Sequence, residues 1–233
     1  HLAIPRNRKS QDIENISFLP KKPKKIKDNW GQETAHYNKT EIDAGNNYSA
    51  SMTIDATIYD LRFFIDPAKV GSLGDIPSEI KDKYLANNEK YQFDHPVIQT
   101  AIKTAIGDEK NPYWMARRMF NHLIDNMYYE MSGGWNTAPT VLARGNGSCS
   151  EYSFTFIAMC RAAGIPARYV GSVVIRGDES AMDDIFHRWA EIYIPNYGWI
   201  PVDASRGDKK LPRDQADAIG HLSNSFVITT QSG

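Results

Sequence analysis

Apolar residues recur along this chain at spacings that predict a mixture of helices and strands. From Met52 to Ile58, every second residue is apolar, which predicts a half-buried strand within residues 48–65. Apolar residues that return every three or four positions predict helices over 77–85, over 95–106 and from Asn111, as cap, to about residue 126. The last of these carries a stripe typical of a core-facing helix: Met115, Met119, Leu123 and Met127.

The first part of the chain lacks any such period. Residues 1–47 are polar and contain Pro, Lys and Asn, which predicts a tail or poorly ordered lead-in. A β-rich segment over 48–75 and a main domain over 76–233 complete the predicted organisation.

A further helix is predicted to begin at Cys149. Ser148 and Glu151 form a Ser-x-x-Glu capping box, and Gly164 followed by Pro166 ends the helix. Residues 167–175 then favour a strand, and residues 186–205 favour a hairpin that turns at 195–198.

The length of the hairpin predicts its register. With the turn centred on Asn196, His187 faces Ser205 and Trp189 faces Asp203. His187 and Asp203 then share a face as diagonal neighbours, roughly 7 Å apart at Cβ. The opposite face is wholly apolar: Ala190, Ile192, Ile194, Ile200 and Val202. We expect the apolar face to pack on the core and the His–Asp face to point toward the helix that carries Cys149.

Composition narrows the possible partners. The net charge is −1, so no global field attracts nucleic acid, and only Lys21–Lys27 is strongly basic. Because the apolar runs fall far short of the ~20 residues of a spanning helix, we expect no membrane span. The first residue is His1 rather than Met, which indicates a processed or trimmed product, and we expect an extracytoplasmic location.

Cys149 is placed where a thiol becomes reactive. The positive end of a helix and a nearby imidazolium both lower the pKa of a thiol below its usual value near 8.5. Gly145 and Gly147 leave room for a substrate carbonyl, and the unpaired N–H groups of the helix provide half of an oxyanion hole. A small buried hydrophobe is the usual role of a lone cysteine, and we assign that role to Cys160 in the middle of the same helix. The two cysteines lie ~16 Å apart along it and cannot form a disulfide.

His187 and Asp203 are the expected partners of this thiol. A cysteine nucleophile needs a base, and the base needs an orienting group. An aspartate within the apolar strand segment 198–203 is unexpected unless it is paired. Metal binding is the competing use of Cys, His and Asp, but the chain has no Cys-x-x-Cys or His-x-x-x-His pair, so we expect neither a metal nor a cofactor.

Three sequence blocks resemble the transglutaminase-like superfamily. They are GNGSCSEYSFTFIAMCRAAGIPARYV around Cys149, HRWAEIYIPNYGWIPVDAS around His187, and GWIPVD ending at Asp203. The resemblance covers roughly residues 96–205. It implies an α+β fold in which a nucleophile helix packs on an antiparallel sheet, as in papain-like enzymes, here preceded by a short β segment.

The resemblance also implies roles for individual residues. Cys149 is the nucleophile, His187 is the general base and then the acid, and Asp203 orients the histidine. Papain-like enzymes carry a glutamine, an oxyanion donor, six positions before the nucleophile, and Ala143 stands there in this chain. Trp135, Asn136 or Asn146 can supply the missing donor, or each can be structural. Trp189 is either a wall of the acyl site or a packing residue.

Three functions follow from this resemblance. The first is a thiol hydrolase that cleaves amide bonds of a protein or peptide substrate through a thioester. The second is a protein-glutamine transglutaminase with an amine acceptor, and the third is a non-catalytic binding module on the same fold. The choice between water and amine depends on the loops 177–184 and 207–220, and we favour the hydrolase because the chain shows no calcium-site pattern of the family.

Overall fold

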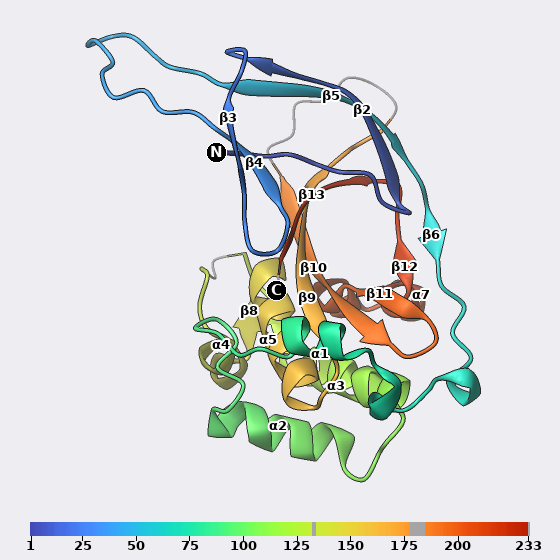
Figure 1. The fold of residues 1–233 in the computed structure, drawn as a ribbon. Coiled ribbons are helices and arrows are strands. Elements are labelled where there is room, and N and C mark those ends of the chain that lie inside the picture. The colour runs from blue at the N-terminus through green and yellow to red at the C-terminus, as the bar shows by residue number, and fades with distance from the viewer. Residues whose placement is uncertain (132–133, 178–184, 233) are drawn as a thin grey trace. The chain divides into compact units, whose positions relative to one another are not determined.

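Helix α5 (Cys149–Ala162) packs on an antiparallel β-sheet in an α+β fold (Figure 1). The structure is a computed structural model that describes residues 1–131, 134–177 and 185–232. The chain divides into two compact units. The first unit contains residues 1–60, 171–186 and 223–232, and the second contains residues 61–170 and 187–222.

The second unit holds most of the helices. They are α1 (Ser78–Tyr84), α2 (Pro96–Ile106), α3 (Pro112–Asn126), α4 (Ala138–Arg144), α5, α6 (Ala204–Gly207) and α7 (Pro212–Asp217), with 3₁₀ turns η1 (Pro67–Lys69) and η2 (Leu73–Asp75). Its strands are β6 (Leu61–Arg62), β7 (Tyr128–Tyr129), β8 (Asn146–Gly147), β10 (Phe186–Ile194, from His187 on), β11 (Gly198–Val202), β12 (His221–Leu222) and the first half of β9 (Ala167–Val174). Within this unit β11, β10 and β9 are neighbours in the sheet.

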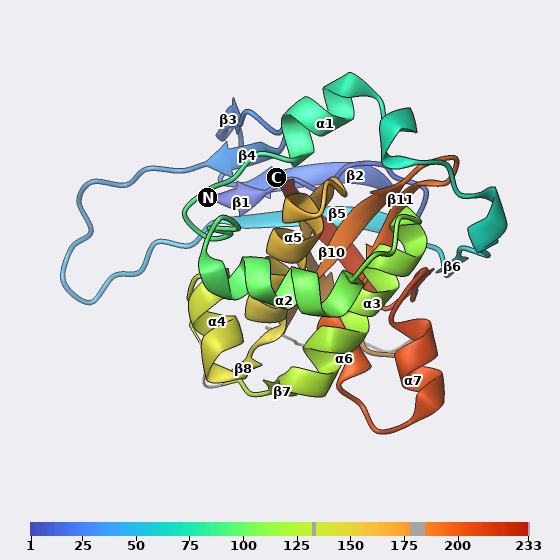
Figure 2. The same ribbon diagram turned by 90° about the horizontal axis from the view of Figure 1, so that it is seen from below.

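Local signals fix the ends of the helices around α5 (Figure 2). The Asn111 side chain accepts hydrogen bonds from the N–H groups of Tyr113 and Trp114, at 3.0 and 3.3 Å, and Pro112 is the first residue of α3. Helix α2 ends at Gly107, whose φ of 57° is a left-handed value that glycine adopts readily. The predicted helices are therefore confirmed within one or two residues, whereas α4, α6 and α7 were not predicted.

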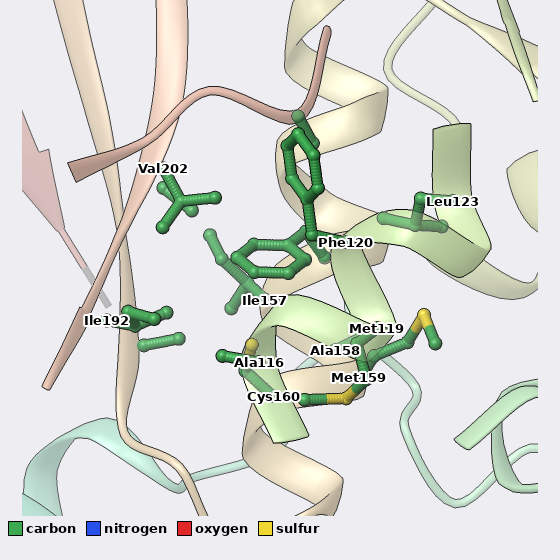
Figure 3. Packing of buried hydrophobic residues seen from close by; sticks show 14 of the residues in the cluster. Ala116, Met119, Phe120, Leu123, Ile157, Ala158, Met159, Cys160, Ile192 and Val202 are labelled. Carbon is green, nitrogen blue, oxygen red and sulfur yellow. The ribbon is translucent and has the colours of Figure 1, made fainter. Parts of the chain in front are cut away.

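The core of the second unit forms where α5 meets α3 and the β10–β11 hairpin. All residues from Cys149 to Arg161 are buried. Figure 3 shows Ile157 of α5 and Phe120 of α3 close to Ile192 and Val202 of the hairpin. Each large apolar side chain buried here contributes about 1.5–3 kcal/mol of stability.

The hairpin has the predicted register. Ala190 pairs with Val202, Glu191 with Pro201 and Tyr193 with Trp199. The apolar face is buried, as expected, and it packs on α5 near Ile157. Helix α5 is itself buried almost all round, so the hairpin is one of several segments that cover it.

The first unit consists of strands. They are β1 (Leu2–Ala3), β2 (Gln11–Leu19), β3 (Lys24–Lys27), β4 (Glu33–His36), β5 (Ser51–Ile58), the second half of β9, and β13 (Phe226–Ser232). Strand β4 lies between β1 and β3, β2 pairs with β5, and β9 is the neighbour of β13. Residues 1–47, expected to be a tail, therefore contain four strands, and the units do not follow the predicted boundaries at 47 and 75.

Buried polar contacts explain why this segment is ordered despite its polarity. Gln11 is fully buried and its side chain bonds both the N–H and the carbonyl of Ile228, at 2.7 and 3.0 Å. Gln11 and Ile228 lie more than 200 positions apart in the sequence, so no local sequence pattern predicts their contact.

Candidate active site

Cys149 is the first residue of α5, as the capping box predicts. Ser148 is the N-cap, and both hydrogen bonds of the box with Glu151 are present. The Cys149 residue is 8% exposed. Cys160, in the same helix, is fully enclosed in the core, and burial raises the pKa of its thiol. The two cysteines therefore sit in opposite electrostatic settings.

Glu151 holds the segments around Cys149 together. Its buried carboxylate accepts hydrogen bonds from the Ser148 N–H at 3.0 Å and the Asn136 amide at 2.9 Å, and it pairs with Arg144 at 2.7 Å. A Cβ at position 147 would lie 3.0 Å from the Cβ of Glu151. The small size of Gly147 therefore serves the packing of Glu151.

His187 and Asp203 are in direct contact. The distance between His187 Nε2 and Asp203 Oδ2 is 2.5 Å. Asp203 was expected to lie in a strand, but it is the N-cap of α6. Its Oδ1 also accepts hydrogen bonds from the Ser205 hydroxyl at 2.8 Å and the Arg206 N–H at 3.0 Å. The β10–β11 ladder begins at Ala190 and Val202, so this contact is made just past its end, where the pairs 187–205 and 189–203 are not formed.

The other nitrogen of the histidine ring faces the thiol. His187 forms a side-chain hydrogen bond with Cys149, and because Nε2 is bound to Asp203, Nδ1 is left for the sulfur. The backbone N–H of Arg188 also donates to the sulfur. Cys149, His187 and Asp203 thus form a hydrogen-bonded chain that starts at the N-terminus of a helix.

The charges of Cys149, His187 and Asp203 stabilise one another. Burial opposes ionisation of Cys149, yet the hydrogen bond and charge of His187 hold the pKa of the thiol below its ordinary value. Burial also opposes the charge on His187, but Asp203 and then Cys149 raise its pKa to about 10. Asp203 keeps a lowered pKa despite its burial, chiefly because of His187. The arrangement therefore stabilises the thiolate–imidazolium pair relative to the neutral thiol and imidazole, beside an ionised Asp203.

Cys149, His187 and Asp203 lie inside a region that matches a known family. Residues 99–204 match the family model of the transglutaminase-like superfamily. The protein contains a transglutaminase-like core. The matched region begins in α2 and ends with the first residue of α6, so it includes α5, the hairpin and Asp203.

Solved and curated proteins also resemble parts of the chain. The crystal structure of a candidate cysteine protease from Cytophaga hutchinsonii has a TM-score of 0.65 and 20% identity, and the match covers 98% of this chain and 73% of that one. An uncharacterized protein of Haemophilus influenzae is 23% identical over 88% of this chain and 62% of its own length. Protein YebA of Bacillus subtilis is 30% identical over 26% of this chain and 10% of its own length. The first likeness shows the fold, and the chain spans 62% of the Haemophilus protein.

The other predicted site residues of the transglutaminase-like core have separate surroundings. The Asn136 amide is bound to Glu151, and the Asn146 amide donates to Glu130 at 2.5 Å and to the Tyr128 hydroxyl at 3.1 Å. Trp189 is buried, with its ring 6.0 Å from that of His187. Both asparagines are thus engaged in structural contacts, whereas the Trp135 ring is 55% exposed.

Tyr129 is a site residue that the sequence did not indicate. Its hydroxyl forms a hydrogen bond with Cys149, and burial together with the nearby thiolate raises the pKa of this phenol. The parallel pairing of β7 with β8 places Tyr129 opposite Gly147, two positions before the cysteine, and Asp208 Oδ2 accepts its backbone N–H at 2.6 Å. Two-residue strands are too short to produce a periodic pattern in the sequence. The one sequence signal for a contact here is that Gly147 lies two positions before Cys149.

The described residues also bear on cofactors and membranes. Among residues 1–131, 134–177 and 185–232, no three His, Cys, Asp or Glu side chains gather as metal ligands would. In the same part of the chain, every helix is too short or too polar to cross a membrane. Of the loops expected to select the acceptor, residues 178–184 lie outside the described residues, and 207–220 include α7.

Proposed function

We propose that this protein is a cysteine-dependent acyl-transfer enzyme that hydrolyses amide bonds of peptides or proteins, with Cys149, His187 and Asp203 as its catalytic residues. The observation that carries the proposal is the hydrogen-bonded chain from Asp203 through His187 to a thiol of lowered pKa at the first residue of α5. A non-catalytic binding module has no need of an ionised thiol, so these hydrogen-bonded residues favour catalysis.

The proposed reaction runs through a thioester. The Cys149 thiolate attacks the carbonyl carbon of the substrate, and a C–S bond forms while the carbonyl oxygen becomes negative. The His187 imidazolium gives its proton to the leaving nitrogen, the C–N bond breaks, and ammonia or an amine departs. Water then attacks the thioester, His187 accepts one of its protons, and cleavage of the C–S bond releases a carboxylic acid and restores the thiolate.

Two groups can stabilise the negative carbonyl oxygen. The N–H groups in the first turn of α5 have no partner within the helix and carry its positive dipole. The Tyr129 hydroxyl already bonds the sulfur, so it lies within reach of an oxygen attached to the adjacent carbon. It takes the role of the donor that Ala143 cannot provide.

Tyr129→Phe is expected to lower kcat by about 10²-fold, because one oxyanion donor is removed while the thiol and its base remain. Steady-state hydrolysis of a peptide substrate measures the effect. Tyr128→Phe is the matched control, because Tyr128 precedes Tyr129 on β7 and its hydroxyl accepts from the Asn146 amide instead. A Tyr129 variant with the wild-type kcat would contradict this role.

Alkylation tests the ionised thiol without a substrate. At pH 6 iodoacetamide is expected to modify Cys149 and leave Cys160 intact, because the pKa of Cys149 is lowered and that of the buried Cys160 is raised. The rate at Cys149 falls as the pH drops through its lowered pKa. Peptide mapping by mass spectrometry locates the label, and protein unfolded in urea should label at both cysteines. Alkylation of Cys149 that begins only near the ordinary thiol pKa of about 8.5 would overturn the proposal.

The acyl donor and acceptor can be identified together. Incubation with a library of peptides followed by acid quenching traps a thioester on Cys149, whose mass names the donor. The products are then weighed after reaction with and without a dansylated amine. A free carboxylic acid in both cases supports the hydrolase, and incorporation of the amine identifies a transglutaminase instead.

A further inference from the structure

The carboxylate of Asp203 has hydrogen-bond partners on both of its oxygen atoms. Oδ2 lies 2.5 Å from His187 Nε2. Oδ1 accepts two further hydrogen bonds, from the Ser205 hydroxyl at 2.8 Å and from the Arg206 N–H at 3.0 Å. One oxygen therefore faces the histidine, and the other is held by the residues that follow Asp203 in the chain.

The two bonds at Oδ1 fix how the carboxylate is turned. The torsion about the Cβ–Cγ bond of an aspartate has broad minima, so a carboxylate that is bound through one oxygen turns readily. The Arg206 N–H restrains Oδ1 from one direction, and the Ser205 hydroxyl adds a second donor. With both donors in place, Oδ2 stays directed at the His187 ring, which is thereby kept in one orientation and one tautomer.

Packing fixes the position of the Ser205 hydroxyl in turn. Ser205 is the second residue of α6 and is buried. Helix α6 lies closely against α3, because a Cβ at position 207 would overlap the Phe120 ring. The start of the helix is anchored by the Asp203 N–H, which donates to the Ala218 carbonyl at 2.8 Å. The hydroxyl thus reaches the carboxylate from a segment that is held on both sides of it.

We infer that Ser205 is a positioning residue for the proposed reaction, whose hydroxyl keeps the Asp203 carboxylate turned toward His187. The inference rests on the proposed function, because it concerns the same three residues. It assigns the hydroxyl to the steps in which His187 transfers a proton, since these steps need a fixed imidazole. Attack by the thiolate on an ester with a good leaving group needs no such transfer.

Hydrolysis of p-nitrophenyl acetate separates the two kinds of step. First the Cys149 thiolate attacks the acetyl carbon, a C–S bond forms, the C–O bond breaks, and p-nitrophenolate leaves without taking a proton. The His187 imidazolium then loses its proton to the solvent. In the second step His187 accepts a proton from the attacking water, the C–S bond breaks, and acetate departs. The amplitude of the initial burst counts the active sites, and the steady-state rate reports the second step.

Ser205→Ala is expected to lower the steady-state turnover per active site by about tenfold or more, because the carboxylate and the imidazole are no longer held in one orientation. The rate of the burst should change little. Ser205→Thr keeps a hydroxyl at this position and should restore most of the turnover. A loss of folded protein would lower the amplitude of the burst instead, without changing the turnover per site.

Ser223→Ala is the matched control, because the Ser223 hydroxyl also bonds a residue two positions along the chain, Ser225, at 2.8 Å. Its turnover per site should equal that of the wild type. Wild-type turnover per site in Ser205→Ala, or an equal loss in Ser205→Ala and Ser205→Thr, would overturn the positioning role and leave the proposed function intact. Absence of a burst from Cys149 in the wild type would instead overturn the proposed function.

Discussion

Replacement of His187 by alanine is expected to lower kcat/KM at pH 7 by about 10³–10⁴-fold. Two contributions are lost at once, since the imidazolium both stabilises the Cys149 thiolate and protonates the leaving nitrogen. The pKa of Cys149 should rise as well, because burial then acts without the compensating charge. Measurements of hydrolysis and of the pH dependence of alkylation follow the two effects separately.

The wild type should show a bell-shaped pH profile against which this variant is compared. kcat/KM rises as the pH passes the lowered pKa of Cys149 and falls as it passes the raised pKa of His187, about 10. The variant loses the alkaline limb. His122→Ala on α3 removes a partly buried histidine of lowered pKa and should keep the wild-type profile. An alkylation profile that is identical in the His187 variant and the wild type would show that the histidine does not act on the thiol.

Glu151→Ala is expected to lower the free energy of unfolding by about 3–5 kcal/mol. The carboxylate is fully buried, and its removal leaves Arg144 and the N–H groups of Asn136 and Ser148 without their acceptor. Urea denaturation followed by circular dichroism measures the loss. Glu109→Ala is a matched control, because Glu109 also accepts from backbone N–H groups and pairs with an arginine, Arg118, but lies near solvent.

The same network makes stability depend on pH. Burial opposes the charge on Glu151, but the hydrogen bonds from Asn136 and Ser148 and the charge of Arg144 lower its pKa below the unfolded value. Its contribution is therefore complete above the unfolded pKa of about 4.3 and disappears as the pH falls through the folded value. The wild type should lose more stability than Glu151→Ala between pH 5 and about pH 3. Equal losses in the two proteins would show that the carboxylate is not selectively stabilised in the folded state.

The sequence by itself determined the features that depend on neighbours within a few positions. Ser148 and Glu151 start α5 at Cys149, Asn111 and Pro112 start α3, and the turn around Asn196 fixes the hairpin register. Each of these signals is a backbone hydrogen bond or a dihedral preference satisfied locally, so the pattern of residue types carries it. The residues around Cys149, His187 and Asp203 also carried the resemblance to the transglutaminase-like superfamily.

Only the tertiary structure decided how distant residues meet at Cys149 and added Tyr129 to them. Tyr129 reaches the sulfur through the pairing of two short strands, and Asp203 meets His187 as the cap of α6 rather than as a strand residue. The strands within residues 1–47 likewise depend on partners as distant as Ile228. Such contacts arise from backbone pairing and packing between segments far apart in the chain, and this pairing leaves no periodic pattern in either segment alone.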